Sequence, residues 1–407
     1  MLCYRLEEST TGRTDLFRRH GAPFKPERND RSVVPAGKSV DGEWAGSAEP
    51  RRYLPVRYLP RCAISSALRL GVILALTCLF AVQPSHAQST SDFYRDKVFK
   101  IIVAAAPGAA YDFVGRALAA SIGRHIPGHP RVIVENQFGA SSLVLMNMLY
   151  NKGPRDGTVI GLPLNGIVLE PRLKLLSQQT GTVGFDLKKM SFVGSPAQQP
   201  QVLWIWHGAP FKSIDDLRRE KSIVGATSVG ADNYVLPVLA NAYLGTKMQI
   251  VKGYGAVNNI FIAGERGEVH GGTVSYASIA GKPDWVRENK ARILLQFGAE
   301  RLSDLPDVPT AAELAASESD KVALRTYALK YKAAYPFIFP PGVPEERVSA
   351  IRAAFMETMK DPQFIEDAKR LGFDVEPVSG QAINQIINDI DAVPQSIMDD
   401  LKSKIMN

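Results

Sequence analysis

The sequence predicts an α/β protein in which parallel strands alternate with helices, and three observations support this prediction. Short β-branched apolar runs recur along residues 101–340. Loops of small residues connect these runs to segments with apolar residues at helical spacing, an alternation typical of a parallel sheet covered by helices. Two extended apolar segments, 202–206 and 335–340, indicate that the chain crosses twice between two such α/β lobes.

The first strand–loop–helix unit spans residues 101–116 and reads IIVAAAPGAAYDFVGR. It begins with a β-branched run, and the small residues 107–110 then turn the chain while leaving its N–H groups uncovered. Asp112 is the predicted N-cap of the helix that follows. Uncovered N–H groups at the positive end of a helix dipole favour an anion, so this loop is a candidate anion site.

Similar units follow along the chain. The predicted strands lie at 131–136, 158–161, 223–226, 248–251, 269–276 and 293–296, and the predicted helices at 143–150, 234–244, 258–264 and 345–359. A small-residue loop at 139–142 and a capping box at 213–216 are also predicted. With the two crossings, we expect lobe one to comprise residues 88–201 and 336–407 and lobe two to comprise residues 202–335.

Charge is distributed unevenly along the 407 residues, whose net charge is +7. Residues 1–87 hold 13 of the 48 Lys and Arg residues but only 8 of the 41 Asp and Glu residues. The rest of the chain is nearly neutral, so it lacks the basic surface with which proteins follow a nucleic-acid backbone. We therefore expect no nucleic-acid partner.

Residues 56–87 have the pattern of a secretory signal peptide. A basic flank precedes the apolar run 70–82, which is too short to anchor the chain in a bilayer, and Ser85-His86-Ala87 supplies a small-x-small cleavage site. We expect export to the periplasm, with residues 1–55 a non-native or disordered extension upstream of a true start near Val56. All three cysteines, Cys3, Cys62 and Cys78, precede the cleavage site, so the mature protein should lack disulfides and cysteine-based sites.

A serine hydrolase is one alternative function. The segment 226–230 is one residue short of a G-x-S-x-G nucleophile elbow, and Ser228, Asp232 and His270 follow one another in the order of a catalytic triad. Asp232, however, is placed as expected for the cap of the helix that begins beside Ser228. We therefore predict that the protein is not an enzyme.

Metal and dinucleotide sites are not predicted. His125 and His129 have i, i+4 spacing, but Pro127 and Gly128 prevent the helix that would direct both imidazoles at one ion. The Gly253-x-Gly255 pair lacks the third glycine of a dinucleotide fingerprint. We expect neither a metal nor a cofactor.

An ordered series of motifs resembles the Bug family, the periplasmic receptors of tripartite tricarboxylate transporters. The matching segments are FYRDKVFKIIVAAAPGAAYDFVGRALA, RVIVENQFGASS, DGTVIG, PFKSIDDL, VKGYGAVNNIFIAGERGEVHGG and LPDVPTAAEL. The resemblance implies a type II periplasmic-binding-protein fold, with two α/β lobes joined by two hinge strands. It also implies that backbone N–H groups of the first loop and of a facing loop in lobe two hold the carboxylate of a solute.

The site residues follow from the resemblance and from the unit boundaries. The predicted ligand-binding residues are Pro107, Gly108, Ala109, Ala110, Tyr111 and Asp112 in the first loop, Thr227, Ser228, Val229 and Gly230 in the second loop, and Asn165 and Tyr276. Relatives usually carry glycine where this chain has Ala109 and Ala110, so we expect the added methyl groups to change which acids fit. Tyr111 and Tyr276 are expected to add aromatic surface, and His207 is expected at the edge of a hinge.

The function predicted on this basis is capture of a small organic acid between two lobes. The receptor, expected to be a monomer, would close on its solute and deliver it to the inner-membrane permease subunits of a tripartite tricarboxylate transporter. The alternatives that stay open are a periplasmic serine hydrolase using Ser228 and a sensor that passes its closed state to a signalling partner.

Overall fold

The computed structural model describes residues 89–175 and 184–406. Its contacts divide the chain into Met1–Gln83 and Pro84–Asn407, and every element below belongs to the second unit. The predicted extension, the signal peptide and the three cysteines lie outside the described residues. None of the helices in the described ranges is long and apolar enough to cross a membrane.

The first sheet has six strands in the order β11-β4-β10-β3-β1-β2. The strands are β1 (Val98–Val103), β2 (Arg131–Asn136), β3 (Val159–Leu162), β4 (Ser191–Ser195), β10 (Phe337–Phe339) and β11 (Val378–Ser379). β1 pairs in parallel with β2 and β3, which confirms the predicted parallel core. β10 runs antiparallel between β3 and β4, and β11 runs antiparallel to β4.

The second sheet has five strands in the order β7-β6-β8-β5-β9. The strands are β5 (Gln201–Trp206), β6 (Ser222–Ala226), β7 (Met248–Lys252), β8 (Gly271–Ser275) and β9 (Ala291–Phe297). β6 is parallel to both β7 and β8, whereas β5 runs antiparallel to β8 and β9. Each sheet therefore combines a parallel strand–helix unit with an antiparallel strand that directly follows a crossing between the sheets, β10 in the first sheet and β5 in the second.

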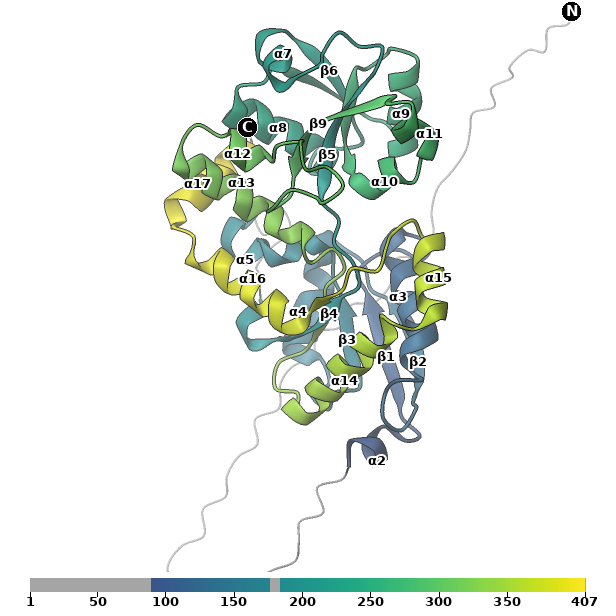
Figure 1. The fold of residues 1–407 in the computed structure, drawn as a ribbon. Helices are drawn as coiled ribbons and strands as arrows, with labels where there is room; N and C mark the ends of the chain where they lie inside the picture. The colour runs from purple at the N-terminus through teal and green to yellow at the C-terminus, as the bar shows by residue number, and fades with distance from the viewer. Residues whose placement is uncertain (1–88, 176–183, 407) are drawn as a thin grey trace, which may run out of the picture. The chain divides into compact units, whose positions relative to one another are not determined.

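Helices follow the strands as the apolar spacing predicts (Figure 1). They are α2 (Thr90–Tyr94), α3 (Ala110–Ile122), α4 (Leu143–Lys152), α5 (Glu170–Leu173), α7 (Ile214–Arg219), α8 (Asp232–Leu244), α9 (Val257–Glu265), α10 (Tyr276–Ala280), α11 (Pro283–Arg287), α12 (Ala311–Leu314), α13 (Glu318–Ala328), α14 (Glu345–Thr358), α15 (Pro362–Arg370), α16 (Gly380–Ala392) and α17 (Gln395–Met406). Short 3₁₀ turns lie at η1 (Ala140–Ser142), η2 (Asn165–Val168), η3 (Leu187–Lys189) and η4 (Leu329–Tyr331). The predicted capping box is present, with Ser213 capping α7 and Asp216 bonded back to it.

The two chain crossings lie beside the segments that the sequence predicts. Residues 202–206 and 337–339 are themselves sheet strands, flanked on both sides, and the crossings are the links 196–200 and 332–336. An apolar β-branched run reads alike in a sheet and in a crossing, which explains the shift of a few residues. The links are tied together, because the Gln199 N–H donates to the Tyr331 carbonyl (2.9 Å) and the Tyr335 N–H donates to Ser195 Oγ (3.0 Å).

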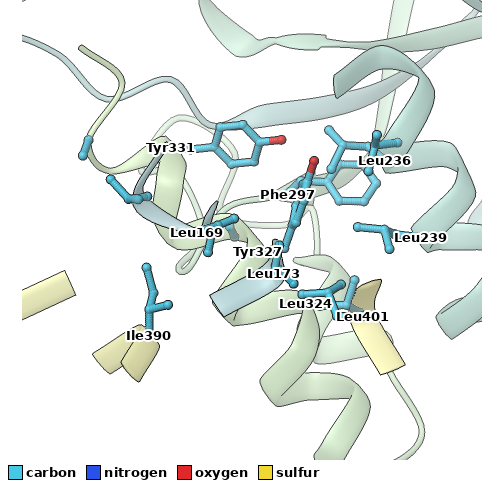
Figure 2. Close-up of a cluster of buried hydrophobic side chains, with 14 of the residues drawn as sticks. Leu169, Leu173, Leu236, Leu239, Phe297, Leu324, Tyr327, Tyr331, Ile390 and Leu401 are labelled. Atoms are coloured by element: carbon cyan, nitrogen blue, oxygen red, sulfur yellow. The ribbon is translucent and has the colours of Figure 1, made fainter. Parts of the chain in front are cut away.

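One hydrophobic core reaches both sheets. It joins Leu169 and Leu173, beside the first sheet, to Leu236 and Leu239 of α8 and to Phe297 of β9 (Figure 2). The C-terminal helix α17 packs against α5, α8 and α13, and the Tyr243 hydroxyl donates to Asp400 Oδ2 (2.8 Å). Helix α17, expected in lobe one, therefore contacts elements of both predicted lobes, and the lobe boundaries stay a prediction.

Candidate functional site

The first loop connects β1 to α3, and α3 begins without a side-chain cap. The N-cap is Ala109, so the prediction that Asp112 is the N-cap is wrong. Asp112 is instead the third residue of the helix, and its carboxylate accepts a hydrogen bond from the Gly108 N–H (2.8 Å). Both positions favour acidic residues, because both lie at the positive end of the helix dipole, and the sequence alone does not separate them.

Asp112 is buried and fully engaged in hydrogen bonds. Its side chain accepts from Arg116 Nε (2.9 Å) and from Asn136 Nδ2 (2.8 Å), and the residue is only 2% exposed. Burial alone would raise the pKa of this carboxyl, but the hydrogen bonds from Arg116, Gly108 and Asn136 outweigh burial and hold the pKa below its usual value. Asn136 also donates to the Ala105 carbonyl (2.9 Å), so the network fixes both ends of the first loop.

Among the predicted site residues 107–112, three N–H groups remain available. The Gly108 N–H is bound to Asp112, the Ala109 N–H donates to the Ala106 carbonyl (3.1 Å), and Pro107 has no N–H. The N–H groups of Ala110, Tyr111 and Asp112 have no acceptor among the described residues. The structure thus narrows the predicted donors to the first turn of α3.

Tyr111 joins the first loop to the second crossing. Its hydroxyl donates to the Ala334 carbonyl (2.7 Å) and accepts from the Asn165 N–H (3.1 Å), while its ring meets the Tyr335 ring edge-on at 4.9 Å. Burial is the main cause that raises the pKa of Tyr111, and the charge of Asp232 adds to it. Asn165 is half-buried, and its side-chain amide has no partner in the described part of the chain. The prediction that this amide contacts the ligand stays untested.

A third loop lies at the same edge of the first sheet, because β1, β2 and β3 are parallel and end together. The predicted small-residue loop after β2 has positive φ at four successive residues, Gly139 (138°), Ala140 (45°), Ser141 (48°) and Ser142 (87°). Ser142 is fully buried, and its Oγ accepts from the Leu164 N–H (2.8 Å). This bond connects the loop after β2 to the segment that carries Asn165.

The second loop connects β6 to α8 in the same way. The Thr227 N–H and hydroxyl both donate to Asn233 Oδ1, each at 3.1 Å, and α8 has Ala231 as an N-cap without a side-chain bond. Gly230 has a φ of 88°, which glycine adopts without steric cost. The N–H groups of Ser228, Val229 and Gly230 have no acceptor among the residues that the structure describes, and the Val229 side chain is 62% exposed.

An ion pair beside the second loop was not predicted from the sequence. Asp232, the first residue of α8, accepts from Lys330 Nζ (2.6 Å) and from the Tyr327 hydroxyl (3.1 Å). Lys330 is 6% exposed and lies over the Tyr327 ring, 4.1 Å from its centroid. A lysine inside the apolar segment ALKYKAAY was the available signal, but its partner is 98 residues away.

The remaining predicted site residue, Tyr276, lies at the first crossing. It is the first residue of α10, and its N–H donates to the Pro200 carbonyl (2.9 Å). Its hydroxyl is 3.5 Å from Asp304 Oδ2, and burial raises its pKa. Within the described ranges no hydrogen bond joins Tyr276 to either loop, so its predicted place in the site stays untested.

The residues of the alternative triad are not brought together. His270 Nδ1 accepts from the Ile223 N–H (2.9 Å) near the start of β6, whereas Ser228 follows the opposite end of that strand. From Ile223 to the end of β6 at Ala226 the strand rises three residues, about 10 Å, and Ser228 lies beyond that end. Asp232 is held by Lys330, so no acid orients His270 toward Ser228 in the described structure.

His125 and His129 lie beyond the end of α3, as the sequence predicts. His125 Nε2 is 2.9 Å from Asp361 Oδ2, and Arg124 also binds this carboxylate (2.5 Å). His129 follows Gly128 with a φ of 50°, and α3 ends at Ile122, so the two histidines do not share a helix. The described residues contain no group of three side chains arranged to hold a metal ion.

Comparison with known proteins places the fold. The chain is 24% identical over 318 residues to the UPF0065 protein in the gbd 5' region of Cupriavidus necator, covering 76% of this chain and 88% of that protein. Among solved structures it is similar to a ligand-free TctC solute binding protein from Polaromonas (TM-score 0.59, 18% identity, 76% of this chain and 98% of that one). It is also similar to the periplasmic binding protein BugD (TM-score 0.50, 18% identity, 76% and 98%).

A further similar structure is R. palustris Rpa4515 with adipate (TM-score 0.51, 19% identity, 77% of this chain and 97% of that one). These likenesses confirm the predicted two-lobe periplasmic-binding fold. Residues 114–402 match the sequence profile described as "Tripartite tricarboxylate transporter family receptor". Because this match spans most of the chain, the protein belongs to the receptor family of tripartite tricarboxylate transporters.

Proposed function

We propose that this protein is a periplasmic receptor that holds the carboxylate of a small organic acid on the free N–H groups of its two loops. One observation carries the proposal. Helices α3 and α8 both begin without a side-chain cap. N–H groups that lack an acceptor among the described residues lie in the first turn of α3 and in the loop just before α8. Such groups, together with the helix dipole, are a preformed anion site.

The relatives support the chemical class of the solute. The similar structure from R. palustris contains adipate, a compound with two carboxylates. Family membership supports delivery of the solute to the membrane subunits of a tripartite tricarboxylate transporter. We infer that the receptor acts as a monomer, is exported to the periplasm and returns its ligand chemically unchanged.

The first experiment identifies the solute. Protein purified from its native host is unfolded, and mass spectrometry identifies the small molecules released. A bound organic acid recovered unchanged supports a receptor, whereas a hydrolysis product that accumulates with time and disappears in Ser228→Ala supports the hydrolase. If cells that lack the permease genes still take up the bound solute, transport does not depend on this receptor's permease. That result favours the sensor.

A second experiment removes one donor without disturbing the helix. Ala110 is the first residue of α3, and Ala109 before it has φ −80° and ψ 163°, a conformation that proline tolerates in its predecessor. Ala110→Pro therefore deletes one candidate N–H while keeping the helix. We expect the affinity for the acid to fall by about 1.5–3 kcal/mol in calorimetric titration, the contribution of a hydrogen bond to a charged group.

The matched control is Glu318→Pro, at the first position of α13 after the N-cap Ser317. It introduces the same residue at the same helix position, and we expect unchanged affinity. Circular dichroism confirms that both variants are folded. If Ala110→Pro binds the acid as tightly as the control does, the first turn of α3 is not the anion site.

A further inference from the structure

The charge at the start of α8 distinguishes this site from a simple anion site. Asp232 brings a carboxylate to the positive end of the helix, the place where a second anion of the solute would otherwise be stabilised. The free N–H groups of Ser228, Val229 and Gly230 immediately precede it. A resident negative charge therefore adjoins the second loop.

Lys330 holds this carboxylate in place from the protein side. Its ammonium donates to Asp232 Oδ1 and to the Tyr327 hydroxyl (2.9 Å), which itself bonds to the same oxygen. The hydroxyl of Tyr331 is buried without a hydrogen-bond partner among the described residues, and the hydroxyls of Tyr327 and Tyr331 point toward the same part of the cluster in Figure 2. These contacts restrict the motion of the Asp232 side chain.

In the ion pair between Asp232 and Lys330, the carboxylate is the more exposed group. The Asp232 side chain is 28% exposed, whereas that of Lys330 is 8% exposed. Both hydrogen bonds reach Asp232 Oδ1, and none from a described residue reaches Oδ2. The ammonium binds Oδ1 directly at 2.6 Å, so Oδ2 is the carboxylate oxygen left to a group that enters beside the second loop.

The negative charge of Asp232 also influences Tyr111 at the first loop. Asp232 contributes to the raised pKa of Tyr111, whose N–H is one of the free donors of α3. The acid of the first loop behaves differently, because Asp112 is 2% exposed and its oxygens are bound to Gly108, Arg116 and Asn136. Of these two acids, Asp232 is therefore the one whose side chain is open to a solute.

We infer that Asp232, positioned by Lys330, makes this receptor selective for organic acids with a single carboxylate. This inference rests on the proposed function and narrows its solute class. The free N–H groups of the two loops take the one carboxylate, and the part of the solute beside Asp232 is neutral, a hydrogen-bond donor or cationic. A second carboxylate there meets a like charge that Lys330 cannot shield from the solvent side.

The test compares acids that differ by one carboxylate. Wild-type protein, freed of bound solute by unfolding and refolding, is titrated calorimetrically with hexanoate and adipate, and with butyrate and succinate. We expect hexanoate and butyrate to bind about tenfold or more tightly than their two-carboxylate counterparts, because like charges brought together in a site disfavour binding.

Variants then assign the selectivity to the pair. Asp232→Asn keeps the shape and removes the negative charge, so adipate and succinate should gain at least about tenfold relative to the monocarboxylates. Because this variant leaves Lys330 buried without its charged partner, the double variant Asp232→Asn with Lys330→Met is a second route to the same readout. Asp215→Asn, an exposed acid paired with Arg218 on α7, is the control and should leave the ratio unchanged.

The outcomes separate the two hypotheses. If wild type binds both members of each pair equally, and neither variant changes the ratio, the inference is overturned while the carboxylate receptor stands. If wild type binds none of the four acids and none is recovered from native protein, the proposed function fails and this inference fails with it.

Discussion

Replacing Asp112 with asparagine should destabilise the protein, because this carboxylate is the centre of the first loop. Oδ2 accepts from the Gly108 N–H and from Arg116 Nε, and Oδ1 accepts from Asn136 Nδ2. An asparagine of the same shape retains one accepting oxygen but presents an NH₂ group to a donor on its other side. At least one hydrogen bond to a charged group is lost, and each contributes about 1.5–3 kcal/mol.

We therefore expect the free energy of unfolding to fall by about 2–4 kcal/mol, the loss of one such bond plus the cost of a mismatched donor. The assay is urea unfolding at pH 7, followed by far-UV circular dichroism. Asp284→Asn is the control, since this acid is 67% exposed beside Arg287 and exposed pairs contribute little. If Asp112→Asn unfolds at the same urea concentration as the control, the network does not stabilise the loop and its apparent rigidity has another source.

Three further predictions concern other parts of the fold. Burial opposes ionisation of Asp361, but hydrogen bonds from neighbouring basic side chains lower its pKa to about 2, below its unfolded value. The stabilising effect of this carboxylate should therefore be present above about pH 4 and lost toward pH 2. In urea titrations, Asp361→Asn should lower the free energy of unfolding at pH 7 but change it little at pH 2. A Cβ on Gly271 would lie 2.0 Å from the Trp204 carbonyl oxygen, whereas a Cβ on Gly255 would meet nothing within 4 Å. Gly271→Ala should therefore lower the unfolding free energy by about 1–3 kcal/mol or abolish soluble expression, and the control Gly255→Ala should do neither. Leu401 of α17 is fully buried, so Leu401→Ala should lower the free energy of unfolding by about 2–5 kcal/mol. Because α17 packs against α5, α8 and α13, amide hydrogen exchange should become faster in all three helices. Faster exchange confined to α17 would contradict its bridging role.

The strand–loop–helix units were predictable because their signals are local. The β-branched run at 101–103 and the small residues after it specify β1 and the first loop, and the capping box at Ser213 specifies α7 within four residues. The resemblance to the family added the pairing of two loops, which no local pattern contains. Local patterns also located the two crossings to within a few residues.

The features that sequence reasoning missed depend on contacts between distant residues. Asp232 and Lys330 are 98 residues apart, and nothing beside either residue identifies its partner. Asp112 was assigned to the wrong helix position because the backbone angles of Ala109, which define the N-cap, are not encoded in residue type alone. The packing of α17 on α8 and α13 depends on where the whole C-terminal segment folds back.

The hydrophobic core that reaches both sheets has a thermodynamic consequence. Two lobes with separate cores could melt one after the other, each with its own transition. Here Leu236, Leu239 and Phe297 share a core with Leu169 and Leu173, so exposing the apolar surface of one half removes the burial partner of the other. The described unit should therefore melt in a single calorimetric transition whose van't Hoff and calorimetric enthalpies agree, and neither half should persist as a folded fragment after proteolysis.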